Sequence, residues 1–287
     1  MKIGVLTDNL KCSSLKESLL KAGQMGFSGI QIYATGGVFS PSLLKDKASF
    51  NEYKKILTDN GLVISALCGD MGGHGFQIHK DNAARVEKTK AIIDFAAACE
   101  TKAVTTHIGV IPNDENSEQF RIMLEALDEL GVYGKQQGIT LAIETGPEAP
   151  ELLKKFIDKT HGGVGVNLDP ANFVMVTGVD PAQAVGVLGK YIVHTHVKDG
   201  ICKKLTDPAK VYGFFAEGGI GDFRMEDYFC ETPVGEGGVN FDAYFAALKR
   251  CGYDGFFTIE REAGSNPEKD IASAKAFIEK KLAAAGY

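Results

Sequence analysis

The sequence predicts an α/β protein folded as a single (β/α)8 TIM barrel, one domain over residues 1–287. Short apolar segments alternate with longer amphipathic segments, which gives eight successive β-then-α units. Most of the short segments are apolar without strict alternation, as expected of parallel strands buried on both faces. The length of 287 residues also suits a barrel, for which about 250 is typical.

The expected strands are short, and several are rich in Val, Ile, Thr, Phe or Tyr, which favour extended backbone. In chain order they are Ile3–Thr7, Gly29–Tyr33, Val63–Cys68, Ala103–His107, Thr140–Glu144, Gly163–Asp169, Tyr191–Val197 and Gly255–Glu260. The first is followed by Thr7-Asp8-Asn9-Leu10 and not by a glycine-rich GxGxxG turn. A doubly wound open sheet that binds a dinucleotide is therefore disfavoured.

Amphipathic patterns predict helices between these strands. In Ser14–Met25, the apolar residues Leu15, Leu19 and Ala22 fall on one stripe of a helix. The same pattern recurs in Asn82–Cys99, Ser117–Gln137, Phe241–Arg250 and Pro267–Ala285. Glycines that we expect to end helices stand before several strands, at Gly26, Gly61, Gly138 and Gly252.

Residues 199–238, after the seventh strand, interrupt the alternation with a long segment rich in glycine and aromatic residues. Loops of this length in a compact domain are usually functional. Six aromatic residues favour a segment that packs over a disordered one: Tyr212, Phe214, Phe215, Phe223, Tyr228 and Phe229. We expect this segment to lie over the active site.

The composition of the chain disfavours some classes of binding partner. A net charge of −6 and the absence of a basic stripe disfavour nucleic acid. No apolar run reaches the roughly 18 residues of a membrane span, so no membrane partner is expected. The N-terminus enters a strand at once, and the six cysteines include no CxxC pair, so we expect reduced thiols and a cytoplasmic location. The oligomeric state, including a homo-oligomer, is left open.

Four consecutive strands end in residues that bind metals. The fifth ends at Glu144, the sixth at Asp169, the seventh carries His194 and His196, and the eighth ends at Glu260. Side chains at the carboxyl ends of barrel strands point to one mouth. Three carboxylates there would repel one another, and a divalent ion is the simplest way to hold them together.

The histidines are assigned by position. His194 and His196 share a face of their strand, and His196, nearer the carboxyl end, is the better ligand. His194 is expected to pack in the core. His107 ends the fourth strand and faces the mouth, where it could bind a second metal or, as we favour, a substrate hydroxyl. His74 stands in a glycine-rich loop that could reach the site.

The residues resemble the xylose isomerase-like TIM barrel superfamily, which includes sugar phosphate isomerases and epimerases and endonuclease-IV-type enzymes. The resemblance covers nearly the whole chain. Its motifs are Ala22–Ile30, Ile143-Glu144-Thr145, Asn167-Leu168-Asp169-Pro170-Ala171-Asn172, His194-Thr195-His196-Val197-Lys198-Asp199, Val234–Phe241 and Thr258-Ile259-Glu260. As an ordered set they indicate the superfamily but do not name a substrate.

In keto-sugar epimerases that the chain resembles, the corresponding Glu, Asp, His and Glu bind one divalent ion. This implies Glu144, Asp169, His196 and Glu260 as metal ligands here. Manganese suits the oxygen-rich set best, with cobalt, magnesium and zinc as alternatives. Asn172 stands where those epimerases often have a substrate-binding histidine, and Gln31 where many relatives have Glu.

The resemblance implies proton transfer next to the carbonyl of a keto-sugar or related polyol. The metal would stabilise a cis-enediolate, while Glu144 and Glu260, expected on opposite sides of the metal, act as acid and base. Return of the proton to the opposite face gives epimerisation, and return to the neighbouring carbon gives isomerisation. His107, Lys198 and Asn172 are the expected substrate contacts.

Three alternatives stay open. A metal-dependent lyase or dehydratase acting on an oxidised sugar, inosose or 3-oxo-glycoside would use the same metal and base. An endonuclease-IV-like phosphodiesterase would need three zinc ions, and the chain lacks the extra histidines at Asn172 and just beyond Asp199. A non-catalytic sugar-binding barrel would need no acidic cluster.

Overall fold

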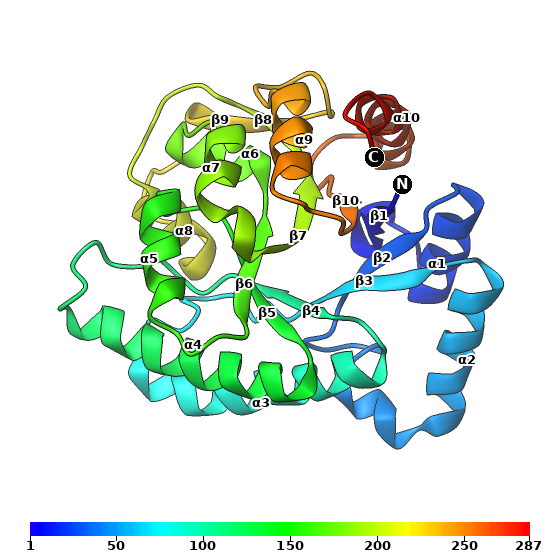
Figure 1. Cartoon of the computed structure of the whole chain (residues 1–287), viewed down its shortest axis with the longest axis horizontal. Coiled ribbons are helices and arrows are strands. Elements are labelled where there is room, and N and C mark those ends of the chain that lie inside the picture. The colour runs from blue at the N-terminus through cyan, green and yellow to red at the C-terminus, as the bar shows by residue number, and fades with distance from the viewer.

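The computed structural model describes residues Met1 to Tyr287 and shows a closed barrel of eight parallel strands (Figure 1). The strands are β1 (Ile3–Leu6), β2 (Gly29–Tyr33), β3 (Val63–Cys68), β4 (Ala103–Thr106), β5 (Thr140–Glu144), β6 (Val164–Leu168), β7 (Ile192–Val197) and β10 (Phe257–Ile259). They follow one another around the barrel in chain order, and β10 pairs with β1 to close it. All eight predicted strands are present, with small differences at their ends.

Helices cover the outside of the barrel (Figure 1). They are α1 (Leu15–Gln24), α2 (Lys47–Asp59), α3 (His79–Ala98), α4 (Glu118–Gln137), α5 (Pro150–Asp158), α7 (Pro181–Leu188), α9 (Phe241–Arg250) and α10 (Pro267–Ala284). The five predicted helices are confirmed as α1, α3, α4, α9 and α10. Gly138 ends α4 in the left-handed conformation that its sequence position predicts (φ 71°).

Eight β-then-α units were predicted, but the sequence patterns gave no bounds for α2, α5 and α7. Helix α2 buries only Tyr53 and Leu57, so its apolar stripe is narrow. Helix α7 has eight residues, which is too short for the repeating pattern to stand out, whereas the nine residues of α5 do place Leu153, Phe156 and Ile157 on one buried face.

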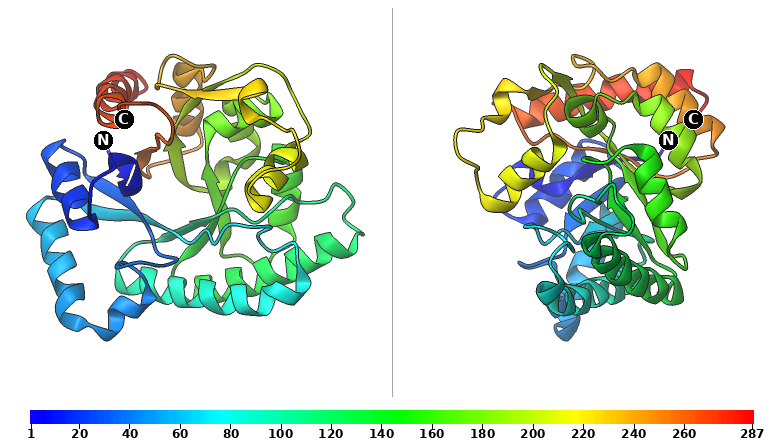
Figure 2. Two further views of the ribbon diagram at one scale, coloured as in Figure 1. Left: turned by 180° about the vertical axis from the view of Figure 1, so that it is seen from behind. Right: turned by 90° about the vertical axis from the view of Figure 1, so that its left-hand side faces the viewer.

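Strand register brings the carboxyl ends together at one mouth. Glu144 of β5 lies opposite Asn167 of β6, and His196 of β7 lies opposite Thr258 of β10. Beneath this layer the barrel interior also holds buried polar side chains, among them His194, Asn167 and Thr258. The two termini lie close together in all views (Figures 1 and 2). The ring of Tyr287 there packs edge-on against Phe257 of β10.

Residues 199–238, which we call the insertion, contain regular structure. It includes the antiparallel pair β8 (Asp199–Cys202) and β9 (Phe229–Thr232) with helix α8 (Pro208–Glu217) between them. The yellow segment in Figure 2 is this part of the chain, standing out from the barrel. Its aromatic residues pack together, with Phe223 stacked on Tyr228 at 4.8 Å between ring centroids. None of the helices is long and apolar enough to cross a membrane.

Candidate metal centre

Four side chains meet at the mouth, and we call them the quartet: Glu144, Asp169, His196 and Glu260. One ligand-type atom from each lies within 4.8 Å of the others, and all four residues are buried. Their strands β5, β6, β7 and β10 are neighbours in the barrel. The structure therefore brings together the four residues that the sequence singles out, on one half of the mouth.

The two glutamates of the quartet flank it. Only β6 and β7 separate the strands of Glu144 and Glu260. We expected the strands of the two glutamates to lie on opposite sides of the mouth. This is wrong, because all four quartet strands belong to one half of the barrel. A bound group at the centre of the quartet would still meet Glu144 on one flank and Glu260 on the other.

Gln31 orients the imidazole of His196. Nε2 of His196 lies 2.9 Å from Oε1 of Gln31, whose own amide group donates to the hydroxyl of Thr105 at 2.9 Å. An amide oxygen only accepts, so Nε2 carries a proton and Nδ1 faces the quartet carboxylates at 3.2–3.5 Å. This arrangement matches metal-binding histidines, whose outer ring nitrogen is held by a neighbouring acceptor.

Asp169 divides its carboxylate oxygens between two tasks. Oδ1 accepts hydrogen bonds from the backbone N–H groups of Ala171 (2.8 Å) and Asn172 (3.0 Å), which caps the short helix α6 (Pro170–Asn172). Oδ2 faces the quartet. The hydroxyl of Thr145 accepts from the Asp169 N–H at 2.9 Å and so ties the end of β6 to the residue after β5. Asp169 is therefore held rigidly with one oxygen free.

Two buried atoms of the quartet test whether a cation fits. Oδ2 of Asp169 and Nδ1 of His196 have no hydrogen-bond partner, although buried polar atoms are nearly always paired. Burial would lower the pKa of His196, but the surrounding carboxylates outweigh it and raise that pKa well above its ordinary value. The site thus favours positive charge, and three carboxylates with one imidazole suit a divalent metal ion.

Lys198 controls the charge of Glu260. Its buried Nζ donates to Glu260 at 3.0 Å and to Glu262 at 2.7 Å. Burial would raise the pKa of Glu260, but Lys198 and His196 hold it well below its usual range. Glu260 is therefore ionised, as a metal-binding carboxylate must be.

His107 stands beside the other glutamate. Its Nδ1 lies 2.9 Å from Asp70, and its Nε2 lies 3.8 Å from Glu144. Burial would lower the pKa of His107, but Glu144 and Asp70 raise it to about 9. His107 is therefore an imidazolium that can donate to a bound molecule. Asp70 was not predicted, although it stands two residues after β3, where the strand-end rule would have found it.

The quartet opens into a hollow of about 690 Å³. His107, Lys198 and Asn172, the predicted substrate contacts, all line it. The amide group of Asn172 donates to the Thr145 carbonyl at 3.0 Å, which leaves its oxygen free. Residues of the insertion that line the same hollow are Val211, Tyr212, Phe215, Met225, Glu226, Phe229, Cys230 and Glu231.

Two other histidines lie outside the quartet. His194 is buried below it, between Asn167 and Thr258 at 2.8 and 2.9 Å, and burial lowers its pKa well below the ordinary value. It is a neutral core residue, as its sequence position predicts. His74 pairs with Glu217 of α8 at 2.5 Å, so it contacts the insertion and not the quartet.

The chain is similar in sequence to proteins of one family. The model of the xylose isomerase-like TIM barrel family matches residues 19–281. An inosose dehydratase of Clostridium perfringens is 27% identical over 176 residues, which cover 58% of this chain and 56% of that protein. The chain thus matches little more than half the length of that curated relative.

Solved structures agree with the fold. A xylose isomerase domain protein from Planctomyces limnophilus has a TM-score of 0.76 at 22% identity and covers 98% of this chain and 96% of its own. A D-tagatose 3-epimerase-like protein has a TM-score of 0.74 at 19% identity, with coverage of 99% and 98%. At these identities the likeness shows the barrel and does not identify a substrate.

Proposed function

Since the chain belongs to the xylose isomerase-like TIM barrel family, we propose that it is a divalent-metal-dependent isomerase or epimerase of a keto-sugar or related polyol. The quartet of Glu144, Asp169, His196 and Glu260 holds the ion. The observation that carries this proposal is the placement of two glutamates on either flank of one buried cluster that favours a cation. Such a pair can serve both directions of a proton transfer.

The ion, when bound, supplies positive charge that stabilises the negative charge developing on the substrate during proton abstraction. We propose manganese, because three carboxylates and one imidazole suit it, with magnesium, cobalt or zinc as alternatives. Fixed ligands such as Asp169 and His196 cost little reorganisation when a substrate binds.

Glu260 is the base in this proposal, because it supplies a carboxylate on one flank of the quartet and lines the hollow. Glu144, on the other flank, delivers a proton to the opposite face of the substrate and so inverts one carbon. Delivery to the neighbouring carbon instead interconverts an aldose and a ketose. His107, Lys198 and Asn172 contact substrate hydroxyl or carbonyl oxygens, and all three line the hollow.

A second candidate is a lyase or dehydratase acting on an oxidised sugar or inosose. Two observations favour it. The dehydratase from Clostridium perfringens is a sequence relative, and the imidazolium of His107 next to Glu144 could protonate a leaving hydroxyl. The same base, Glu260, would begin both reactions.

The test is solvent labelling. Manganese-loaded protein is incubated in deuterated water with free ketoses, phosphorylated ketoses, inosose and 3-oxo-glycosides, and products are scored for deuterium and mass. We expect deuterium on the carbon next to the carbonyl of one isomerised or epimerised sugar. A new carbon–carbon double bond with loss of water would establish the lyase. Absence of label and of product across the panel would refute both candidates.

A further inference from the structure

Tyr212 brings part of the insertion into the mouth. It belongs to α8 and lines the same hollow as Glu144, Gly146 and His107. Its ring meets His107 edge-on, with 5.8 Å between ring centroids. The insertion therefore adds a polar side chain to the site in addition to covering it.

Gly146 makes room for the hydroxyl of Tyr212. A Cβ atom at residue 146 would overlap that hydroxyl and come within 3.2 Å of the ring. Gly146 is not among the glycines with positive φ, so its backbone conformation does not require glycine. The close approach of Tyr212 explains the missing side chain. Gly146 stands two residues after Glu144, and both line the same hollow as Tyr212.

The hydroxyl is a donor without a protein acceptor. Burial and the carboxylates of Glu148, Glu144 and Asp70 raise the pKa of Tyr212 well above its ordinary value, so the phenol is neutral. No hydrogen bond joins it to these acids, and both carboxyl oxygens of Glu148 lack any partner. A neutral donor in a polar hollow gains a hydrogen bond when a ligand brings an acceptor oxygen.

The insertion is held firmly at its base and only by an exposed pair at the carboxyl end of α8. The carboxylate of Asp199 accepts hydrogen bonds from the backbone N–H groups of Gly235 (2.9 Å), Gly237 (2.9 Å) and Val239 (3.1 Å), which binds the two ends of the insertion together. The far end of α8 is held by the exposed pair of His74 and Glu217. Exposed pairs contribute little, so the carboxyl end of α8 is weakly held, whereas Val211 near its start is buried in the hydrophobic core.

We propose that Tyr212 is a substrate-binding residue, whose hydroxyl donates a hydrogen bond to a substrate oxygen held beside Glu144 and His107 when α8 covers the mouth. The inference rests on the proposed function, because that function supplies a polyhydroxylated substrate at the quartet. Part of the specificity for such substrates then comes from the insertion, because the Tyr212 hydroxyl contacts the substrate and Gly146 leaves room for that hydroxyl.

The experiment measures ligand binding and not turnover. Calorimetry with magnesium-loaded protein compares xylitol, myo-inositol and D-fructose as probes. The variants are Tyr212→Phe, which removes only the hydroxyl, and Gly146→Ala, which displaces the ring. Tyr228→Phe is the matched control, because Tyr228 lies in the same insertion, stacks on Phe223 and does not line the hollow.

We expect Tyr212→Phe to weaken the binding of at least one probe about three- to tenfold, the effect of one lost hydrogen bond. Gly146→Ala should weaken it at least as much and speed amide hydrogen exchange in residues 208–217, whereas Tyr228→Phe should bind as the wild type does. Equal binding by wild type and Tyr212→Phe would overturn the inference, as would unchanged exchange in Gly146→Ala. A clear Tyr212 effect without turnover of any sugar would overturn only the proposed function, and no binding of any probe by the wild type would overturn both.

Discussion

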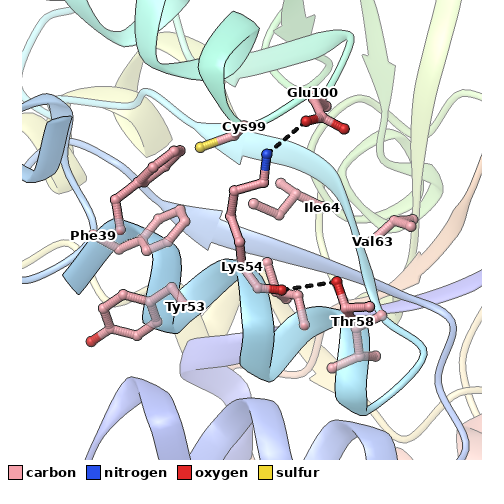
Figure 3. A pocket seen from close by; sticks show the side chains of 11 residues that line it. Phe39, Tyr53, Lys54, Thr58, Val63, Ile64, Cys99 and Glu100 are labelled. Carbon is pink, nitrogen blue, oxygen red and sulfur yellow. Dashed lines mark hydrogen bonds and ion pairs between the residues drawn. The ribbon is translucent and has the colours of Figure 1, made fainter. Parts of the chain in front are cut away.

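The hollow at the mouth of the barrel and a second hollow beneath α2 are built from different side chains. The second, of about 200 Å³, is lined mainly by apolar residues of α2 and β3, with Phe39 and Cys99 at its edge (Figure 3). Its charged groups are satisfied: Lys54 donates to Glu100 at 2.6 Å, and both side chains are exposed. At the mouth, by contrast, Asp169 and His196 each bury an atom that has no hydrogen-bond partner.

A hollow alone therefore does not identify a functional site, and the pairing of its polar groups must also be considered. Apolar walls with paired charges are accounted for by packing and solvation of the folded chain. Buried polar atoms without partners are destabilising, so their retention in a cluster needs another explanation, and a bound cation provides one. If this is so, substitutions at the mouth should reduce metal binding or turnover, and substitutions at the second hollow should change only stability.

The largest effect is expected for Glu260→Gln at the mouth. The amide keeps the size of the side chain but cannot accept a proton, so the turnover rate should fall by about two to four orders of magnitude, roughly 3–5 kcal/mol in the barrier. Steady-state kinetics on the substrate found by solvent labelling measures this, and circular dichroism checks that the barrel is folded. Retention of most of the activity would show that Glu260 is not the base.

Leu57→Ala enlarges the second hollow. Leu57 is buried on α2 and lines that hollow, so the free energy of unfolding should fall by about 2–4 kcal/mol. Turnover at a temperature where the variant is folded should match the wild type. Urea unfolding followed by circular dichroism gives the first quantity. A large loss of turnover in folded Leu57→Ala would contradict the view that this hollow is structural.

Gln31→Leu removes the acceptor that orients His196 while leaving the quartet intact. Outer partners of metal-binding histidines typically contribute 10–100-fold in affinity, so manganese should bind more weakly by about that factor. Gln31→Glu keeps an acceptor oxygen and is the matched control, which should bind manganese better than Gln31→Leu does. Competition with a chelator measures both variants. Equal affinity of Gln31→Leu and wild type would count against the assigned orientation of His196.

The smallest effect is expected for Glu100→Gln. The pair with Lys54 is exposed, so its loss should leave the midpoint of urea unfolding and the turnover close to those of the wild type. It replaces Glu by Gln as Glu260→Gln does, but at the other hollow. Comparable losses of activity in Glu100→Gln and Glu260→Gln would contradict the view that only the hollow at the mouth is functional.

Local patterns were sufficient to predict the barrel and the quartet. Each of Glu144, Asp169, His196 and Glu260 ends an apolar strand, and parallel strands in a barrel end at one mouth, so position along the chain was enough. Gln31 could not be paired with His196 in advance, because 165 residues separate them and the contact depends on the closed barrel. From the sequence, Tyr212 was predicted only to be one of several aromatic residues that pack within the insertion.

The metal content of the purified chain shows whether the quartet binds one divalent ion. After dialysis against manganese and removal of free metal, elemental analysis should find about one ion per chain in the wild type, because the quartet forms one site with positions open to substrate. His196→Ala, which removes the imidazole and its orphaned Nδ1, should retain far less. A wild type that retains no metal, or His196→Ala that retains as much as the wild type, would contradict the account, and two or three tightly held ions would bring Asp70 and His107 into the ligand set.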